Sequence, residues 1–415
     1  MSENARRILL ITGFILVVLG LGFGLYWVFF RGAPVTNVPT GNIPTVPGGG
    51  LPTPGQGSTS TGGQPSTSTG GLPPVGGIIP TPIPPLPTGV PATVRTQVVT
   101  QTAVQQVSMS SGGSVRGYNP TDGKFYKYSA DGVATPLSNQ TFYNVQDVAW
   151  AQQSDKAVLT YPDGSNIYYD FATDKQVTLP RHWDGFSFSP QDDKIVTKSV
   201  GNNEDNRFLV IANPDGSNAK AIEPLGNNQD KVDVSWSPNN QVVAFSHTGD
   251  ALGFDREQIL LIGQNHENFK GLVVEGRGFL PEWSPSGQNL LYSVYSGADN
   301  YKPTIWFSGA EGDNVNANRT NLQLNTWADK CAWSSETVVI CGVPTTMPDG
   351  AGLQRDLAQN IPDEIYKIDL SSGTKVNLGV AAGNASVKQM SVTPDGKTAL
   401  FTDATTGRLV RFDLQ

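Results

Sequence analysis

The sequence has few ionisable side chains for its length, and this scarcity limits the sites it can build. Charged residues make up 15% of the 415 residues, against about 25% in an ordinary soluble domain. The 28 Lys and Arg are outnumbered by 36 Asp and Glu, so the net charge is −8. Nucleic acid is therefore not expected as a partner, because binding phosphates needs a basic face. Three His and two Cys leave too few ligands for a multi-His or multi-Cys metal centre, and no cofactor is expected.

Catalytic motifs are also missing. The sequence has no Gly-x-Ser-x-Gly elbow, no His-Glu-x-x-His and no phosphate-binding loop, so we do not expect an enzyme. Two weaker possibilities stay open. One is a two-His metal site made by His182 and His247. The other is a pair of carboxylates for glycoside cleavage, for which the candidates are Glu204, Asp205, Asp250, Asp255, Asp299 and Asp349.

Residues 8–30 form a run of 23 residues without a charge. As a helix the run would extend about 35 Å, enough to cross a bilayer core of about 30 Å. Arg6 and Arg7 precede it, so the positive-inside rule places residues 1–7 in the cytoplasm and the rest of the chain outside. A cleaved signal peptide would have a shorter apolar region. We therefore expect an uncleaved, single-pass signal anchor that spans the cell membrane, in which Gly20 and Gly24 match a helix-dimer motif.

Residues 31–94 have the composition of a disordered linker. Between residues 32 and 94 there is no charged residue or His, while 15 of the 30 prolines and 14 of the 46 glycines lie there. Such a segment cannot bury enough apolar surface to offset the entropy lost on ordering. We expect it to act as a tether, and its Ser, Thr and Pro content also suits O-glycosylation.

Residues 95–415 have the pattern of an all-β domain. Short runs of β-branched and aromatic residues, such as Asn-Ile-Tyr-Tyr-Asp-Phe at 166–171, are bounded by Gly, Asn, Asp and Pro. No apolar period of 3.6 residues continues beyond two turns. Residues 162–166 and 214–218 both read Pro-Asp-Gly-Ser-Asn, and without alternating Asp ligands they predict hairpin turns, not calcium loops.

A sequence repeat predicts the architecture of this domain. Residues 234–238 read Val-Ser-Trp-Ser-Pro and residues 281–285 read Pro-Glu-Trp-Ser-Pro, and related segments recur. The anchor positions are spaced 38, 48, 47, 50 and 59 residues apart, at Trp150, Phe188, Trp236, Trp283, Trp333 and Val392. Each anchor is followed by a turn and two or three further strands, which is typical of a propeller blade. We expect the large anchor side chains to fill the space between neighbouring blades.

These segments resemble the TolB-like, WD40-like (PD40-type) propeller repeat, in which Trp-Ser-Pro-Asp-Gly turns recur in register. The resemblance covers about residues 145–415 and implies a circular propeller used mainly for protein–protein contact. The sequence departs from TolB itself in two ways. It has no separate N-terminal α/β domain, and a membrane anchor replaces the cleaved signal.

The number of blades follows from the strands at the two ends of the domain. Runs at 104–108, 115–118, 124–128 and 133–137 predict an additional blade before the first anchor. The last unit has only three strands, and a strand near residues 93–99 would supply its fourth and close the ring. We expect seven blades, with six as the alternative.

In this strand order, the loops between the second and third strands lie at the same end as the connections between blades. These loops vary most in length, and variable loops on a rigid scaffold are where binding sites form. The predicted contact residues on this face are Arg181, His182, Trp183, Arg277, Phe279 and Trp327. We expect a binding module outside the membrane that recognises a protein or a cell-envelope ligand. The alternatives are a propeller enzyme acting on cell-surface polysaccharide or peptide, such as a glycosidase or lyase, and a structural envelope component.

The two cysteines lie in neighbouring predicted strands. Cys331 begins the innermost strand of its unit and Cys341 ends the next strand. Antiparallel pairing about Glu336 would put the two residues directly opposite each other, with Cα atoms about 4.5–5.5 Å apart. That is within disulfide range, and an exported domain favours a bond. The alternative is two buried free thiols.

Overall fold

The computed structural model describes residues 20–21, 95–267 and 269–415. Gly20 and Leu21 are helical, but the remainder of the predicted membrane span lies outside the described residues, as do residues 1–7 and the 31–94 linker. No helix within the described part of the chain is long and apolar enough to cross a bilayer. All described strands belong to one compact unit.

The strands form seven four-stranded antiparallel sheets, and each is named a blade, numbered along the chain. Blade 1 contains β2 (Gln105–Met109), β3 (Val115–Asn119), β4 (Lys124–Tyr128) and β5 (Ala134–Pro136), and blade 2 contains β6 (Asp147–Trp150), β7 (Lys156–Thr160), β8 (Asn166–Asp170) and β9 (Lys175–Leu179). Blade 3 contains β10 (Trp183–Phe188), β11 (Ile195–Val200), β12 (Arg207–Ala212) and β13 (Lys220–Pro224). Blade 4 contains β14 (Val232–Val234), β15 (Val242–Ser246), β16 (Glu257–Gly263) and β17 (Leu272–Val274).

The next three blades complete the ring. Blade 5 contains β18 (Arg277–Trp283), β19 (Asn289–Tyr295), β20 (Pro303–Gly309) and β21 (Thr320–Asn321), and blade 6 contains β22 (Cys331–Ser335), β23 (Val338–Pro344), β24 (Asp363–Asp369) and β25 (Lys375–Val380). Blade 7 contains β26 (Val387–Val392), β27 (Thr398–Asp403), β28 (Leu409–Asp413) and, from the start of the domain, β1 (Thr96–Val98). Short 3-10 helices lie in the loops: η1 (Glu204–Asn206), η2 (Gly226–Lys231), η3 (Gly297–Asp299), η4 (Gly312–Asn314), η5 (Ala328–Lys330), η6 (Arg355–Ala358) and η7 (Ala382–Asn384).

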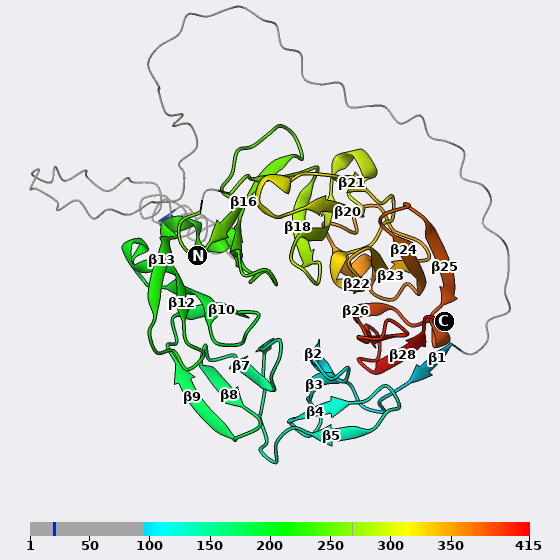
Figure 1. Ribbon diagram of the computed structural model, residues 1–415, viewed down its shortest axis with the longest axis horizontal. Coiled ribbons are helices and arrows are strands. Elements are labelled where there is room, and N and C mark those ends of the chain that lie inside the picture. The colour runs from blue at the N-terminus through cyan, green and yellow to red at the C-terminus, as the bar shows by residue number, and fades with distance from the viewer. Residues whose placement is uncertain (1–19, 22–94, 268) are drawn as a thin grey trace, which may run out of the picture. The chain divides into compact units, whose positions relative to one another are not determined.

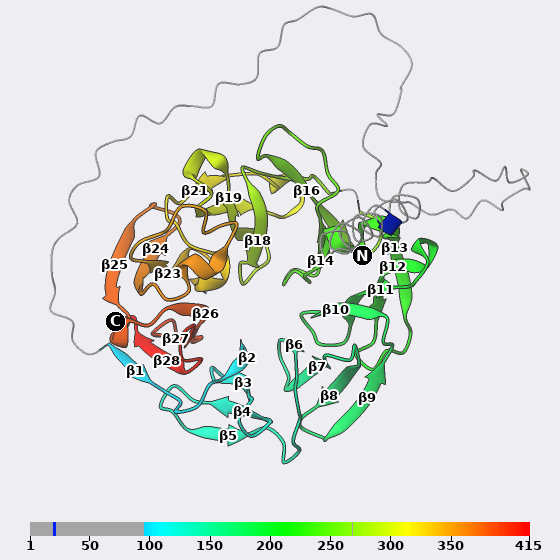
Figure 2. The same cartoon turned by 180° about the vertical axis from the view of Figure 1, so that it is seen from behind.

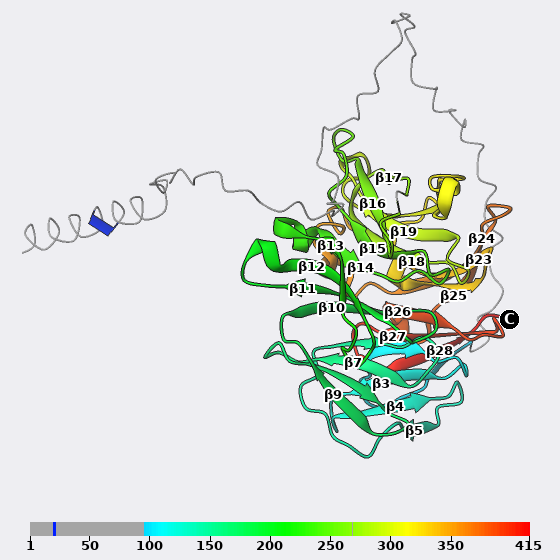
Figure 3. The same ribbon diagram turned by 60° about the vertical axis from the view of Figure 1, so that its left-hand side comes forward.

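The ring closes by pairing the two ends of the domain. Strand β1 lies antiparallel to β28, with Thr96 opposite Phe412 and Val98 opposite Val410. Figures 1 and 2 show β1 beside β28, with β2, β6, β10, β18 and β26 toward the middle and β5, β9, β13 and β25 at the periphery. The turned view in Figure 3 shows the blades following one another in the same order. The predictions of a seven-bladed propeller and of a closing strand near residues 93–99 are confirmed.

The anchor side chains pack between blades, as predicted. Trp150 meets Phe125 of blade 1 edge-to-face, with ring centroids 5.5 Å apart. Trp283 of blade 5 stacks on Phe245 of blade 4, with centroids 5.3 Å apart and the planes inclined by 22°. Each ring therefore reaches from the innermost strand of one blade into the preceding blade, where apolar contact holds the two sheets together.

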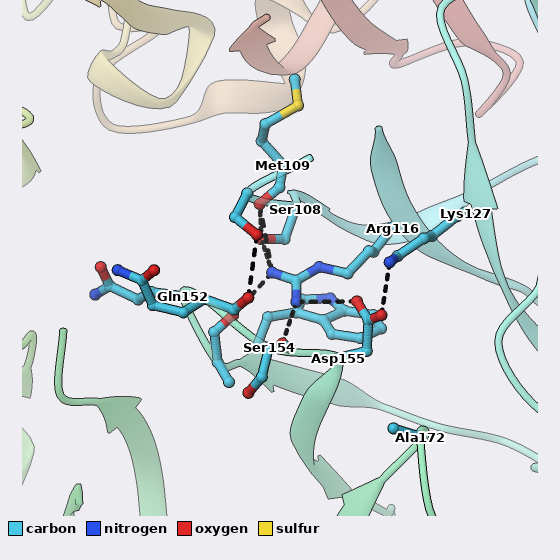
Figure 4. A network of polar contacts seen from close by, with 12 residues as sticks. Ser108, Met109, Arg116, Lys127, Gln152, Ser154, Asp155 and Ala172 are labelled. Atoms are coloured by element: carbon cyan, nitrogen blue, oxygen red, sulfur yellow. Dashed lines mark hydrogen bonds and ion pairs between the residues drawn. The ribbon is translucent and has the colours of Figure 1, made fainter. Parts of the chain in front are cut away.

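A buried arginine joins blades 1 and 2 at the end of the ring where first strands turn into second strands (Figure 4). Arg116, on β3, is 1% exposed. Its Nη1 donates to the Ser154 carbonyl at 2.6 Å and its Nη2 to the Ala151 carbonyl at 2.8 Å. The guanidinium lies over Trp150 at 4.8 Å from the ring centroid, and its Nη1 is 3.7 Å from Asp155 Oδ1. Because Arg116 belongs to blade 1 and these acceptors belong to blade 2, Arg116 acts as a cross-blade clamp.

The next junction uses a carboxylate in the corresponding turn. Asp192 of blade 3 accepts hydrogen bonds from the Gln152 and Ser154 backbone N–H groups, each at 2.7 Å, and from Ser154 Oγ at 2.7 Å. Together, Arg116 and Asp192 hold the turn of blade 2 from both sides. Polar side chains thus supplement apolar packing between successive blades.

The two cysteines pair as the register predicted. Cys331 on β22 lies directly opposite Cys341 on β23, with Cα atoms 4.0 Å apart, and the two sulfur atoms are joined in a disulfide. Both residues are buried, at 2% and 0% exposure. The bond therefore ties the innermost strand of blade 6 to its neighbour inside the core.

The oxidised state can be checked by alkylating the denatured protein with and without reductant. We expect no alkylated cysteine without reductant and two after reduction, as measured by the mass of the intact chain. Closing so short a loop should stabilise the fold by about 2–3 kcal/mol. Two alkylated thiols without prior reduction would show that the purified protein has no such bond.

Candidate functional site

One end of the ring carries the longest loops, and it is named the loop-rich end. Because all four strands of a blade are antiparallel, the connection into the first strand and the loop from second to third strand emerge at this same end. The loop-rich end of blade 6 contains residues 345–362, which include η6, and that of blade 4 contains residues 247–256. These two long loops are therefore at one end of the propeller, as predicted for loops between second and third strands.

A cavity of about 520 Å³ opens at the loop-rich end between blades 6 and 7. That volume lies in the range of small-ligand sites, about 300–1,000 Å³. The floor is made of buried residues and the rim of exposed or half-exposed polar residues. The floor contains Trp327, Lys330, Ala358, Ser386 and Val387, and the rim contains Asp329, Arg355, Asp356, Gln359, Lys388, Gln389 and Ala404.

Trp327 and Arg355 form one wall of the cavity. The Arg355 guanidinium lies over the Trp327 ring, 4.8 Å from its centroid. It also forms a bidentate pair with Asp329, with Nη1 and Nη2 donating to the two carboxylate oxygens at 2.7 and 2.8 Å. A planar guanidinium held by two hydrogen bonds and an aromatic face is well oriented. This pair fixes the long loop of blade 6 to the connection that enters the same blade.

A buried ion pair includes one of the floor residues, Lys330. Lys330 Nζ donates to both carboxylate oxygens of Asp363, at 3.1 and 2.9 Å, and the two residues are 3% and 0% exposed. Asp363 also accepts from the Val387 N–H at 2.5 Å. Burial lowers the pKa of the Lys330 ammonium and raises the pKa of the Asp363 carboxyl, while each charge partly opposes the shift of the other. The ion pair thus lies within blade 6, and the hydrogen bond from Val387 to Asp363 joins it to blade 7 at the cavity.

Ser386 and Lys388 form the blade 7 side of the cavity. Ser386 is 1% exposed. Its backbone N–H donates to Asp403 at 3.1 Å, and its carbonyl accepts from the Ala404 N–H at 2.7 Å. Its buried hydroxyl lies against the Asp363 carboxylate, where it helps to oppose the rise that burial causes in the pKa of that carboxyl. Lys388 is exposed, and no carboxylate of the described residues lies within 4.0 Å of its ammonium.

The long loops of blades 4, 5 and 6 support one another. The Gly297 N–H of blade 5 donates to Asp255 of blade 4 at 2.8 Å, and the Gly352 N–H of blade 6 donates to the Tyr301 carbonyl of blade 5 at 2.8 Å. Three neighbouring loops are therefore linked by hydrogen bonds into a continuous ridge. Large apolar side chains stand exposed on its two outer loops: Leu252, Phe254, Leu353 and Leu357.

The six residues predicted to contact a partner lie at the loop-rich end but at three separate blade junctions. Arg181 and His182 are exposed between blades 2 and 3, and Arg277 is exposed between blades 4 and 5. Arg181 pairs with Asp163, while Arg277 pairs with Asp255 and lies over Phe254. Of the predicted set, only Trp327 lines the cavity.

The three predicted aromatic contacts are largely enclosed. Trp183, Phe279 and Trp327 are 6%, 7% and 7% exposed. Each lies where the chain enters the first strand of a blade, and there a large ring is covered by the neighbouring blade. Little of the surface of these rings is accessible to a partner. Substituting them should therefore lower the stability of the fold more than the sequence alone suggested. The contact roles of Arg181, His182 and Arg277 stay predictions.

His247 is held between two carboxylates instead of facing His182. Its Nε2 lies 3.1 Å from Asp233 and its Nδ1 lies 3.6 Å from Glu257. Hydrogen bonding to Asp233, and then to Glu257, raises the pKa of His247 to about 9 against the opposing effect of burial. The imidazolium is therefore charged at neutral pH and joins β14, β15 and β16 of blade 4. Among the described residues, no group of three or more His, Cys, Asp or Glu is arranged to hold a metal ion.

The His247 contacts predict a pH-dependent contribution to stability. The folded-state pKa of about 9 lies above the unfolded value of about 6.5, so the stabilisation is complete below pH 6.5 and is lost as the pH rises through 9. His247→Gln should therefore lower the free energy of unfolding by about 1 kcal/mol at pH 6, allowing for solvent screening, and by much less at pH 10. Urea unfolding at both pH values measures this, with His182→Gln as the control. An equal effect at the two pH values would contradict the assignment.

The sequence reading missed Arg355, Asp363, Ser386 and Lys388. A usable signal was present for two of them. Ser386 and Lys388 precede the anchor Val392 by six and four residues, near the offset at which Trp183 and Asp184 precede Phe188. Residues about four to six positions before an anchor lie at the loop-rich end. Polar residues at these positions were therefore candidates for a binding site. The pairing of Lys330 with Asp363, 33 positions apart with β22 and β23 between them, had no comparable sequence signal.

No family model matches the sequence, and no curated protein matches it either. Solved structures do match. The β-propeller domain of Cps50 (Swd1) from Myceliophteria thermophila is 11% identical with a TM-score of 0.52, over 77% of this chain and 100% of that chain. Oligogalacturonate lyase from Vibrio parahaemolyticus is 12% identical with a TM-score of 0.52, over 77% and 93%. A chain of a mitotic checkpoint complex is 12% identical with a TM-score of 0.50, over 81% and 98%. The likeness shows the propeller fold.

Proposed function

We propose that the chain is a binding module whose loop-rich end holds a partner protein at blades 4 to 7. The observation that carries this proposal is the cavity between blades 6 and 7, together with the exposed apolar side chains on the blade 6 loop beside it. Leu353 and Leu357 are 62% and 47% exposed on a loop that hydrogen bonds and the Arg355–Asp329 pair hold in place. Exposed apolar side chains on a pre-ordered surface favour association, because little conformational entropy is lost on binding.

The fold itself admits both binding and catalysis, since one similar structure is a chain of a protein complex and another is a lyase. We favour binding because most of the charged side chains that line the cavity between blades 6 and 7 are held in ion pairs within the protein. The TolB-like repeat implied by the anchor segments supports the same choice. A structural envelope role would also use this surface, but it would not require the cavity.

The proposed place of action is outside the cell membrane. Residues 8–30 anchor the chain in the bilayer, residues 31–94 form a tether, and the propeller lies on the extracytoplasmic side. The charges at Arg6 and Arg7 support this orientation, and a disulfide suits an oxidising compartment. The partner is then another envelope protein or an envelope ligand.

Protease treatment of intact cells or spheroplasts tests the location. Cleavage in the tether should release a soluble fragment of about residues 95–415, detected with an antibody against the propeller. Full protection of the propeller under these conditions would contradict an extracytoplasmic location. Lysed cells serve as the control for cleavage of the tether.

Photo-crosslinking tests the binding surface. A photoreactive amino acid replaces Leu357 at the loop-rich end or, as the matched control, Val376 on the outermost strand of the same blade, because both side chains are 47% exposed. We expect position 357 to yield a discrete adduct with one protein and position 376 to yield none. The same adducts from both positions, or none from position 357, would contradict a partner at this end.

A further inference from the structure

The ridge formed by the long loops of blades 4, 5 and 6 exposes large apolar side chains on its two outer loops. The ridge contains residues 247–256, 296–302 and 345–362. Phe254 is 81% exposed beside the exposed Leu252 on the blade 4 loop, and Leu353 and Leu357 are exposed on the blade 6 loop. Apolar side chains that gather at one end of a protein mark a surface that a partner covers.

The basic side chains of this ridge are already paired with carboxylates of the protein. The pairs are Arg256 with Glu275, Lys302 with Asp349 and Arg355 with Asp329, at 3.2, 3.2 and 2.7 Å. The charged His247 lies between two further carboxylates. The ridge, whose residues are all described, therefore has no free positive charge to offer an anionic partner.

The acidic side chains of the ridge are only partly paired. Asp255 and Asp349 have basic partners. The others are exposed, and no Lys, Arg or His side chain of the described residues lies within 4.0 Å of their carboxylates: Asp250, Asp299 and Asp356. Asp250 stands just before Leu252, and Asp356 directly precedes Leu357. A free negative charge therefore accompanies the exposed apolar side chains on both outer loops.

This combination selects among the possible occupants of the ridge. An anionic bilayer and a second copy of this chain are both disfavoured, because the net charge is −8 and the ridge has no free positive charge. The chain's own residues 32–94 contain no charged residue, so they offer nothing that pairs with the carboxylates. A partner segment with both apolar and basic side chains complements the two features of this surface.

We propose that the ridge binds a partner protein through a segment in which Lys or Arg side chains stand among large apolar ones. The apolar side chains of that segment pack on Phe254 and on the exposed leucines, and its basic side chains pair with Asp250 and Asp356. This assignment rests on the proposed protein-binding function, which it makes specific by naming the chemistry of the recognised segment. Because these carboxylates are free before binding, they also attract a basic segment from a distance.

The test measures the binding of three peptides to the purified full chain in an uncharged detergent, with protein-free micelles as the blank. They are Leu-Lys-Phe-Leu-Lys-Leu-amide and its counterparts with Gln or Glu in place of both Lys residues, all with the same fluorescent label. Fluorescence anisotropy reports binding. We expect the Lys peptide to bind about fivefold more tightly than the Gln peptide at low salt, since exposed ion pairs contribute modestly, and the Glu peptide to bind least tightly. The preference should fall as added salt screens the charges.

Two double variants with the same change in net charge separate a local effect from a general one. Asp250→Asn combined with Asp356→Asn should remove most of the preference for the Lys peptide and leave the affinity for the Gln peptide unchanged. The matched control combines Asp147→Asn with Asp205→Asn, because both carboxylates are exposed on blades 2 and 3 without an ion pair among the described residues. The control should keep the preference. Phe254→Ser should weaken the binding of all three peptides.

Equal affinity for the Lys and Gln peptides would overturn the proposal, and so would an equal loss of preference in the two double variants. Failure of the Lys peptide to bind at up to about 1 mM would have the same consequence. Tightest binding of the Glu peptide would point to an acidic partner instead. If these titrations fail while the crosslink from position 357 is specific, the proposed function stands and only the basic segment is lost. If the crosslink also fails, both are lost.

Discussion

Replacing Arg116 by Met is expected to lower the free energy of unfolding by about 3 kcal/mol. The substitution keeps the apolar stem but removes the hydrogen bonds to the carbonyl groups of Ala151 and Ser154, both at the junction of blades 1 and 2. It also removes the cation over Trp150. Buried acceptors left without a donor are each unfavourable by about 1–3 kcal/mol. Urea unfolding followed by tryptophan fluorescence measures the change.

The matched control is Arg181→Met, since Arg181 is exposed and pairs with an exposed Asp163. Surface ion pairs of this kind contribute about 0–1 kcal/mol, so the control should be close to the parent protein. A similar loss for the two variants would mean that Arg116 has no special role. A loss confined to Arg116 would support the cross-blade clamp seen in Figure 4.

Replacing Asp363 by Ala is expected to have an equal or larger effect, about 3–5 kcal/mol. The change leaves the Lys330 ammonium buried without its partner and deprives the Val387 N–H of its acceptor. Because Lys330 comes from the connection into blade 6 and Val387 begins β26, the seam between blades 6 and 7 should loosen. The midpoint of urea unfolding should fall, and hydrogen exchange should rise first at β26.

A second pair of variants separates loss of the ion pair from loss of packing. In Lys330→Met, burial still raises the pKa of the Asp363 carboxyl, and the opposing positive charge is gone. The folded state then holds a proton that the unfolded state releases near pH 4, so the stability of this variant should fall as the pH rises above about 4. Lys330→Met combined with Asp363→Leu should recover part of the loss. A double variant no more stable than Asp363→Ala would show that shape, and not charge, sets the requirement.

Much of the architecture was predictable from local sequence patterns. The anchors Trp150, Phe188, Trp236 and Trp283 each precede turn residues and are spaced one blade apart, and each marks the innermost strand of a blade. The closing strand β1 was predictable because the last unit had three strands and an open edge is unfavourable. The opposition of Cys331 and Cys341 followed from strand pairing about a short turn. These features depend on residues close in sequence or on the repeat itself.

The candidate site was only partly predictable. Reasoning from strand order put the variable loops and Trp327 at the loop-rich end, and that placement agrees with the structure. The same reasoning presented Trp183 and Phe279 as surface residues, although each is covered by a neighbouring blade. Burial at a blade junction depends on the twist and separation of two sheets, and a single repeat does not encode either quantity.

By itself, the sequence predicted the repeating units, the closure of the ring and the end at which variable loops gather. The reason is that period-two alternation, turn residues and anchor spacing act locally and are repeated in every blade. Only the tertiary structure decided which of many loop residues meet. The cavity combines side chains from residues 327 to 404, brought together by packing of blade 6 against blade 7. Whether Lys330, Arg355 and Lys388 are paired or free depends on that packing, because a charge is neutralised by whichever partner the fold places within a few ångströms.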